Sequence, residues 1–169
     1  MNVEIYILEC IIMCIVFGTV VMSIIIKNPV SMISDYPPEI QDRYYQTQGK
    51  AIEKEKMTIG IAIRKIIGLI IFAVVFAWMV LIAGGDTFFK ALFMTYGYMF
   101  VIFAFDTFFL DWVLFANIKK VRLPGTEDMD KEYHQKWFHV KACFPMIPVF
   151  LIGGLAIAGI ELLIYPFVL

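Results

Sequence analysis

Residues 61–83 read IAIRKIIGLIIFAVVFAWMVLIA, and this stretch decides the class of the protein. Its only charged residues are Arg64 and Lys65, close to its start. About 20 consecutive apolar residues are enough for an α-helix to cross a hydrocarbon core of roughly 30 Å. A helix is favoured because a segment in lipid must satisfy its backbone hydrogen bonds internally. The stretch therefore predicts a membrane-spanning helix.

Three further runs of this kind occur, at about residues 5–26, 88–115 and 142–167. The first has no Lys or Arg before it and no small-residue cleavage site after it, so we expect a retained helix and not a signal peptide. The third is longer than a span requires and is expected to tilt or to project into the interface. The predicted fold is all-α, a polytopic integral membrane four-helix bundle in which residues 1–169 form a single transmembrane domain.

Composition supports this class of protein. Hydrophobic residues make up 61% of the chain, whereas soluble domains are roughly 45–50% apolar. The net charge of −1 gives no indication of nucleic-acid binding. Cys10 and Cys14 lie one turn apart on one predicted helix, and Cys143 is expected at the opposite membrane face, so no disulfide framework is predicted. We interpret them as small apolar side chains, with a soft-metal site at Cys10, Cys14 and Met13 as the alternative.

The distribution of lysine and arginine predicts the topology. Basic residues collect in the connections 27–60 and 116–141, whereas GGDTFF, between the second and third runs, has only Lys90 beside it. Since positive charge stays on the cytoplasmic side, both termini are predicted to be extracytoplasmic in a multi-pass protein of the cell membrane. The basic residues in or beside the two connections are Lys27, Arg43, Lys50, Lys54, Lys56, Arg64, Lys65, Lys119, Lys120, Arg122, Lys131, Lys136 and Lys141.

The first connection is predicted to be amphipathic. Its SDYPP stretch (34–38) indicates the start of a short helix, capped by Ser34 or Asp35, with proline in the first turn. Ile40 and Tyr44, one turn apart, are expected to face the headgroup layer, and Gly49 to end the helix. KAIEKEKMT (50–58) predicts a solvated extension of the second span. Either a surface helix or a lid over a cytoplasmic opening fits this pattern.

The second connection contains the turn signal LPGT at residues 123–126. Thr126 or Asp128 is predicted to cap a helix that continues into the fourth span. His134 and His139 lie five residues apart, about 140° around an α-helix, which is not the i,i+4 spacing of metal motifs. No metal site shared by the two histidines is predicted. His139 alone, at the membrane boundary, is the better candidate for a polar site or a proton shuttle.

Ionisable residues inside the runs define the main candidate site. A charge at the bilayer centre costs about 3 kcal/mol on insertion scales, so Arg64, Asp106 and Asp111 each require a partner or a function. Arg64 is predicted to pair with one of the two aspartates. The aspartates lie five apart and cannot share a narrow α-helical stripe, but they can flank one cavity. With His139 and Glu127 on the same side, they form a candidate substrate or ion site, and a structural salt-bridge network is the alternative.

Two more acids, Glu9 and Glu161, are predicted near the outer ends of the first and fourth spans. They could approach each other, either as neutral hydrogen-bonded acids or as a proton or cation site. In the fourth span, Gly154 and Ala158 form a small-xxx-small pair that permits close helix packing. This face is the predicted contact for a second copy of the chain or for a partner membrane protein.

Three functions remain open at this stage. No nucleotide, zinc-protease, nucleophile-elbow or CxxC motif occurs, and the sequence identifies neither catalytic residues nor a cofactor. The favoured hypothesis is a small membrane protein that binds or transports a small solute or ion. The first alternative is an enzyme acting on a lipid or isoprenoid-like substrate at the cytoplasmic interface, with Asp111, Glu127 and His139 as acid–base groups or metal ligands. The second is an accessory subunit of a membrane complex.

Overall fold

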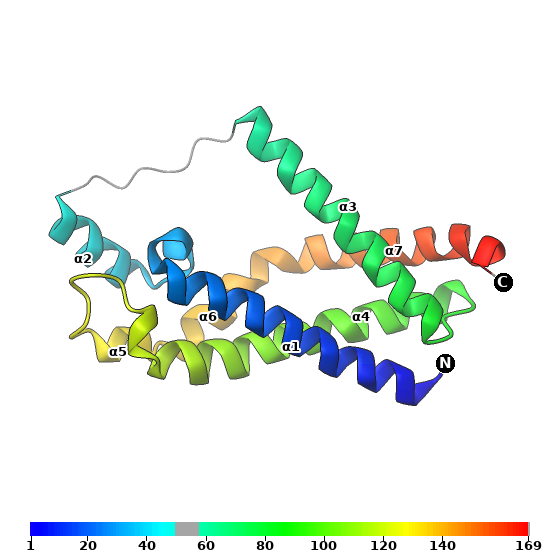
Figure 1. The fold of residues 1–169 in the computed structure, drawn as a ribbon, viewed down its shortest axis with the longest axis horizontal. Helices are drawn as coiled ribbons and strands as arrows, with labels where there is room; N and C mark the ends of the chain where they lie inside the picture. The colour runs from blue at the N-terminus through cyan, green and yellow to red at the C-terminus, as the bar shows by residue number, and fades with distance from the viewer. Residues whose placement is uncertain (50–57, 169) are drawn as a thin grey trace. The chain divides into compact units, whose positions relative to one another are not determined.

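The computed structural model describes residues 1–49 and 58–168, and every regular element within them is helical (Figure 1). Four helical segments are long and apolar enough to cross a membrane: Val3–Lys27, Ile59–Ile82, Phe88–Phe115 and Lys136–Phe167. They correspond to the four predicted runs, which confirms an all-α protein with four candidate spans. The side of the membrane on which each connection lies stays a prediction. The expected helical extension at KAIEKEKMT lies, except for Thr58, outside the described residues.

The helical elements follow one another with short interruptions. In chain order they are α1 (Val3–Lys27), η1 (Pro29–Asp35), α2 (Pro38–Gln48), α3 (Ile59–Ile82), α4 (Phe88–Phe105), η2 (Asp106–Phe115), η3 (Lys119–Val121), α5 (Asp130–Tyr133), α6 (Lys136–Cys143), η4 (Phe144–Met146) and α7 (Ile147–Val168). Of these, η1, η3 and η4 are 3₁₀ turns, whereas η2 is π-helical and continues α4 directly.

The described chain divides into two compact units, each assembled from segments that are distant in sequence. The first unit comprises residues 1–13, 58–102 and 145–168, and the second comprises 14–49 and 103–144. This division does not test the prediction of a single transmembrane domain.

The core of the first unit is formed by α3, α4 and α7. Its fully buried alanines, among them Ala77, Ala91 and Ala158, let the helix backbones approach closely. Gly154 on α7 is buried against the ring of Tyr96, whose hydroxyl donates to the carbonyl of Leu151 at 2.9 Å. The predicted small-residue pair therefore packs inside the chain, and its use by a partner stays a prediction.

The core of the second unit is aromatic. Tyr36 is fully buried, donates its hydroxyl to the carbonyl of Val121 at 2.6 Å, and packs its ring against Phe115 at a centroid distance of 4.9 Å. Ile40 and Tyr44, expected at the headgroup layer, are instead buried in this core. The two residues do share one helix face, as predicted, but this face packs into the protein core and not against lipid headgroups.

The start of α2 differs from the prediction, whereas its end agrees. Pro37 occupies the N-cap position and no side chain caps the helix; the Ser34 hydroxyl donates to Asp35 at 3.2 Å. The capping role of Ser34 or Asp35 is therefore wrong. Gly49 ends α2 in the left-handed conformation, with φ 61°, as expected of a residue without a Cβ.

The second connection does not continue as one helix into the fourth span. The short α5 ends at Tyr133, and α6 begins only at Lys136. Thr126 does not cap α5: its hydroxyl donates to the carbonyl of Leu123 at 2.7 Å and is bonded to the Tyr133 hydroxyl at 2.7 Å. These bonds hold the LPGT turn to the second core instead of extending a helix.

Candidate functional site

A change of helix type brings the two aspartates of the third span together. From Asp106 to Phe115 the helix is π-helical, so its backbone hydrogen bonds join residues five apart. Asp106 and Asp111 have this separation and interact electrostatically. The expectation that the two aspartates cannot share a narrow stripe assumed α-helical spacing, which this segment does not have. π-helical turns are rare and frequently occur at functional sites.

Asp111 is paired with His139 on α6. The imidazole Nδ1 lies 3.2 Å from Oδ2 of Asp111, and the two side chains are 9% and 22% exposed. The contact is a hydrogen bond to a neutral imidazole or an ion pair when the imidazole is protonated. Nε2 of His139 is buried without a hydrogen-bond partner within the described part of the chain. One end of the ring is thus held by a carboxylate while the other is free for a ligand.

Two further carboxyl groups face this pair. Asp106 interacts electrostatically with Asp111, His139 and Asp35, the last residue of η1. Burial raises the pKa of Asp35, and the charge of Asp111 raises it further, against the opposing effects of the Ser34 hydroxyl and of His139. We call Asp35, Asp106, Asp111 and His139 the polar cluster. It lies entirely within the second unit and joins three acids to one imidazole.

Thr107 and Cys143 lie beside the polar cluster, and the sequence did not predict either residue to be near it. Thr107 is fully buried, and its hydroxyl has no hydrogen-bond partner by distance and angle, although the Cys143 thiol lies near it. Cys143 also interacts electrostatically with Asp106 and Asp111. Asp35 was read only as a helix cap. The sequence gives no periodic signal for these residues, since they come from three separate segments.

Glu127 has a local role in the structure. Its carboxylate accepts a hydrogen bond from the amide of Gly125 at 3.0 Å, and its carbonyl accepts one from Arg122 at 2.6 Å. Arg122 is buried, forms an ion pair with Asp130, and lies 5.0 Å from the centroid of the Tyr133 ring. Within the described residues Glu127 therefore stabilises the turn, and its participation in a ligand site stays a prediction.

Arg64 lies in the first unit, on α3, where it is exposed and donates from Nε to the carbonyl of Gly60 at 3.3 Å. Asp106 and Asp111 belong to the second unit. The partner that the structure gives Asp111 is His139, a candidate residue of the same predicted site that was not expected to pair with it. An ion pair of Arg64 with an aspartate stays a prediction.

The two outer acids lie in the first unit in different surroundings. Glu9 accepts a hydrogen bond from the hydroxyl of Tyr98, a residue that sequence reasoning missed. The ring of Tyr98 packs on Tyr6 at 4.4 Å. Glu161 is fully buried, and neither of its carboxyl oxygens has a hydrogen-bond partner within residues 1–49 and 58–168. The proton or cation role of both acids stays a prediction.

The two histidines separate in the structure. His134 is exposed, and its Nδ1 lies 2.6 Å from the carbonyl of Asp130, whereas His139 is buried in the polar cluster. No group of three or more His, Cys, Asp or Glu side chains in the described residues is arranged to hold a metal ion. Comparison of the chain with family models, with curated proteins and with solved structures gives no match.

Proposed function

We propose that the protein is a multi-pass protein of the cell membrane that binds or transports a proton or a small cation through the polar cluster. The observation that carries the proposal is the pair of half-buried Asp111 and buried His139, which interacts electrostatically with two more carboxyl groups and leaves one imidazole nitrogen unpartnered within the described residues. Ionisable groups within an apolar span are costly, and they commonly mark ion and substrate pathways.

Membrane insertion is supported by the outer surface of α3. Five residues between 66 and 71 form an apolar surface that nothing within residues 1–49 and 58–168 covers; they are Ile66, Ile67, Leu69, Ile70 and Ile71, each at least 50% exposed. Soluble monomers rarely expose an apolar patch of this extent, whereas lipid tails would cover it. With the predicted orientation, the polar cluster belongs to the cytoplasmic half of the membrane.

The chemistry of the polar cluster favours a positively charged ligand. Three carboxyl groups outnumber the single imidazole, so the cluster has an excess of acceptors and of negative charge when its acids are ionised. A proton can be held between Asp111 and His139, and the excess of carboxyl groups would attract a small cation although the described side chains are not arranged as a metal site. An anionic solute would meet charge repulsion from all three acids.

Glu161 supports a second position for a positive charge, in the first unit. A buried charge without a partner costs considerable free energy, so this side chain is favoured as a neutral acid or with a bound cation. Glu9 is already hydrogen-bonded by Tyr98 and is the weaker candidate of the two.

Reconstitution into liposomes tests the proposal. Purified protein is placed in vesicles containing a pH-sensitive dye, and proton entry is followed after a proton, Na⁺ or K⁺ gradient is imposed. We expect wild-type protein to conduct or exchange protons, and Asp111→Asn and Asp106→Asn to return the flux to that of empty vesicles. The matched control is Asp42→Asn, an exposed acid on α2 outside the polar cluster. Wild-type flux equal to that of empty vesicles, or full flux in both variants, would overturn the proposal.

A further inference from the structure

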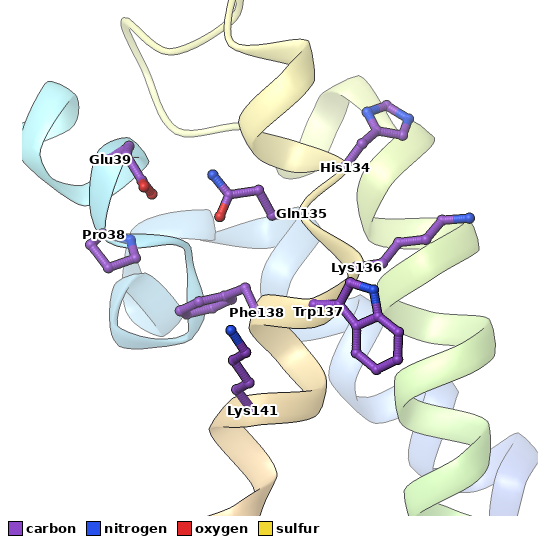
Figure 2. A pocket seen from close by; sticks show the side chains of 8 residues that line it. All are labelled: Pro38, Glu39, His134, Gln135, Lys136, Trp137, Phe138 and Lys141. Carbon is purple, nitrogen blue, oxygen red and sulfur yellow. The ribbon is translucent and has the colours of Figure 1, made fainter.

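A separate cavity of about 650 Å³ lies in the second unit, where the start of α2 meets the start of α6 (Figure 2). Its walls include Glu39 on α2, Gln135 just before α6, and Lys136, Trp137 and Lys141 on α6. None of the residues of the polar cluster lines it. The cavity is therefore a different candidate site with its own chemistry.

The charge of the cavity walls is positive. Lys136 and Lys141 contribute two positive charges, and among the described residues of the lining Glu39 contributes the only carboxylate. Lys136 is already engaged, because its Nζ lies 5.3 Å from the centroid of the Trp112 ring, whose indole N–H donates to the Lys136 carbonyl at 3.1 Å. Lys141 has no ion pair within the described part of the chain, and Figure 2 shows it extending in a different direction from Lys136. Lys141 is thus the lysine available to an anion.

The apolar surroundings identify where such an anion would come from. Trp137 lines the cavity with 69% of its surface exposed, and Phe144, one residue beyond α6, is 60% exposed. Both lie in the first turns of the segment Lys136–Phe167, which is long and apolar enough to span a membrane. Exposed aromatic residues at the end of a span favour the headgroup layer, and a lysine beside them meets lipid phosphates.

We infer that this cavity binds the phosphate of an anionic phospholipid headgroup, with Lys141 as the principal charged contact and Trp137 beside the upper acyl chains. The inference rests on the proposed membrane insertion but not on the proposed role of the polar cluster. A soluble phosphate compound shares the same chemistry for Lys141, but it makes no use of the exposed aromatic surface.

Native mass spectrometry of the full chain in detergent tests the inference, with phosphatidylglycerol as the probe and phosphatidylcholine as the neutral reference. Lys141→Gln should weaken phosphatidylglycerol binding about fivefold, the effect of about one kcal/mol per interfacial lysine, and Lys141→Arg should restore it. Lys120→Gln is the matched control, since Lys120 is an exposed lysine outside the cavity, and binding should stay within about twofold. The thermal unfolding midpoint of each variant verifies that it is folded.

Three results would overturn the inference. The first is unchanged phosphatidylglycerol binding in Lys141→Gln, and the second is equal binding of both lipids by wild-type protein. The third is binding of inorganic phosphate in lipid-free detergent as tight as that of phosphatidylglycerol, which would identify a soluble ligand. Asp111→Asn separates this inference from the proposed function, because it should lose proton flux and keep phosphatidylglycerol binding.

Discussion

Asp35 is the acid of the polar cluster that lies outside the four candidate spans, so its protonation can be followed separately. Its pKa is raised mainly by burial and further by the charge of Asp111. The folded chain therefore keeps this proton to a higher pH than the unfolded chain does. Stability that depends on the protonated form is fully present below the ordinary pKa of 3.8 and is lost as the pH rises through the raised value.

Asp35→Asn should remove the loss of stability that follows deprotonation of Asp35. We expect the thermal unfolding midpoint of wild-type protein in detergent to fall as the pH rises above about 4, and that of the variant to fall less. At neutral pH the variant should therefore be the more stable of the two. Asp42→Asn serves as the control and should follow the wild-type curve. A variant less stable than wild type at pH 7 would contradict this account of Asp35.

The membership of the polar cluster shows where residue-level prediction ends. Asp106, Asp111 and His139 were identified from the cost of polar groups in apolar runs, a rule that needs no tertiary structure. Asp35, and Thr107 beside the cluster, were missed because Asp35 has an ordinary turn role and Thr107 an ordinary helix position. Only the folding of η1 and α6 beside η2 makes them neighbours of the aspartates, and no local pattern records that contact.

At the scale of elements, the four apolar helices were predictable because length and hydropathy alone define them. The π-helical form of η2 was not, since residues 106–115 have the composition of an ordinary apolar helix. The break between α5 and α6 was also missed. It depends on Thr126 and Tyr133, whose hydroxyls bond to each other and to the backbone of Leu123. These bonds join residues three to ten apart and hold a turn where a continuous helix was predicted.

The LPGT turn gives a prediction at this scale. Gly125 has φ 83°, and a Cβ there would lie 2.7 Å from Cγ2 of Thr47 on α2. Gly125→Ala should therefore destabilise the protein by about 1–3 kcal/mol, through left-handed strain and overlap with Thr47. Gly60→Ala on α3 is the opposite control: a Cβ there meets nothing within 4 Å, and the change should stabilise by about 0.4–1 kcal/mol. Thermal unfolding in detergent measures both; equal effects of the two substitutions would refute the argument.

At the scale of the whole molecule, the direction of insertion decides what each site can do. The positive-inside rule predicts that the connections 27–60 and 116–141 are cytoplasmic, and with them the cavity at Lys141 and the approach to the polar cluster. An anionic lipid site at Lys141 makes physical sense on that side, because the cytoplasmic leaflet carries the negative surface potential. Glu161 would then approach the opposite face. In the reverse orientation, the cavity at Lys141 would be extracytoplasmic and Glu161 would lie toward the cytoplasm.

Cysteine labelling in intact cells tests this orientation. In a background with Cys10, Cys14 and Cys143 replaced by alanine, single cysteines are introduced as Asn2→Cys, Thr87→Cys, Gln48→Cys and Lys120→Cys, all at exposed positions. A membrane-impermeant maleimide should label Asn2→Cys and Thr87→Cys directly, and Gln48→Cys and Lys120→Cys only after permeabilisation. The reason is that 13 of the 14 lysines and arginines lie in or beside the two connections predicted to be cytoplasmic; Lys90 is the exception. The reverse labelling pattern would show that the polar cluster belongs to the outer half of the membrane. Labelling of all four positions without permeabilisation would show that the apolar helices do not span.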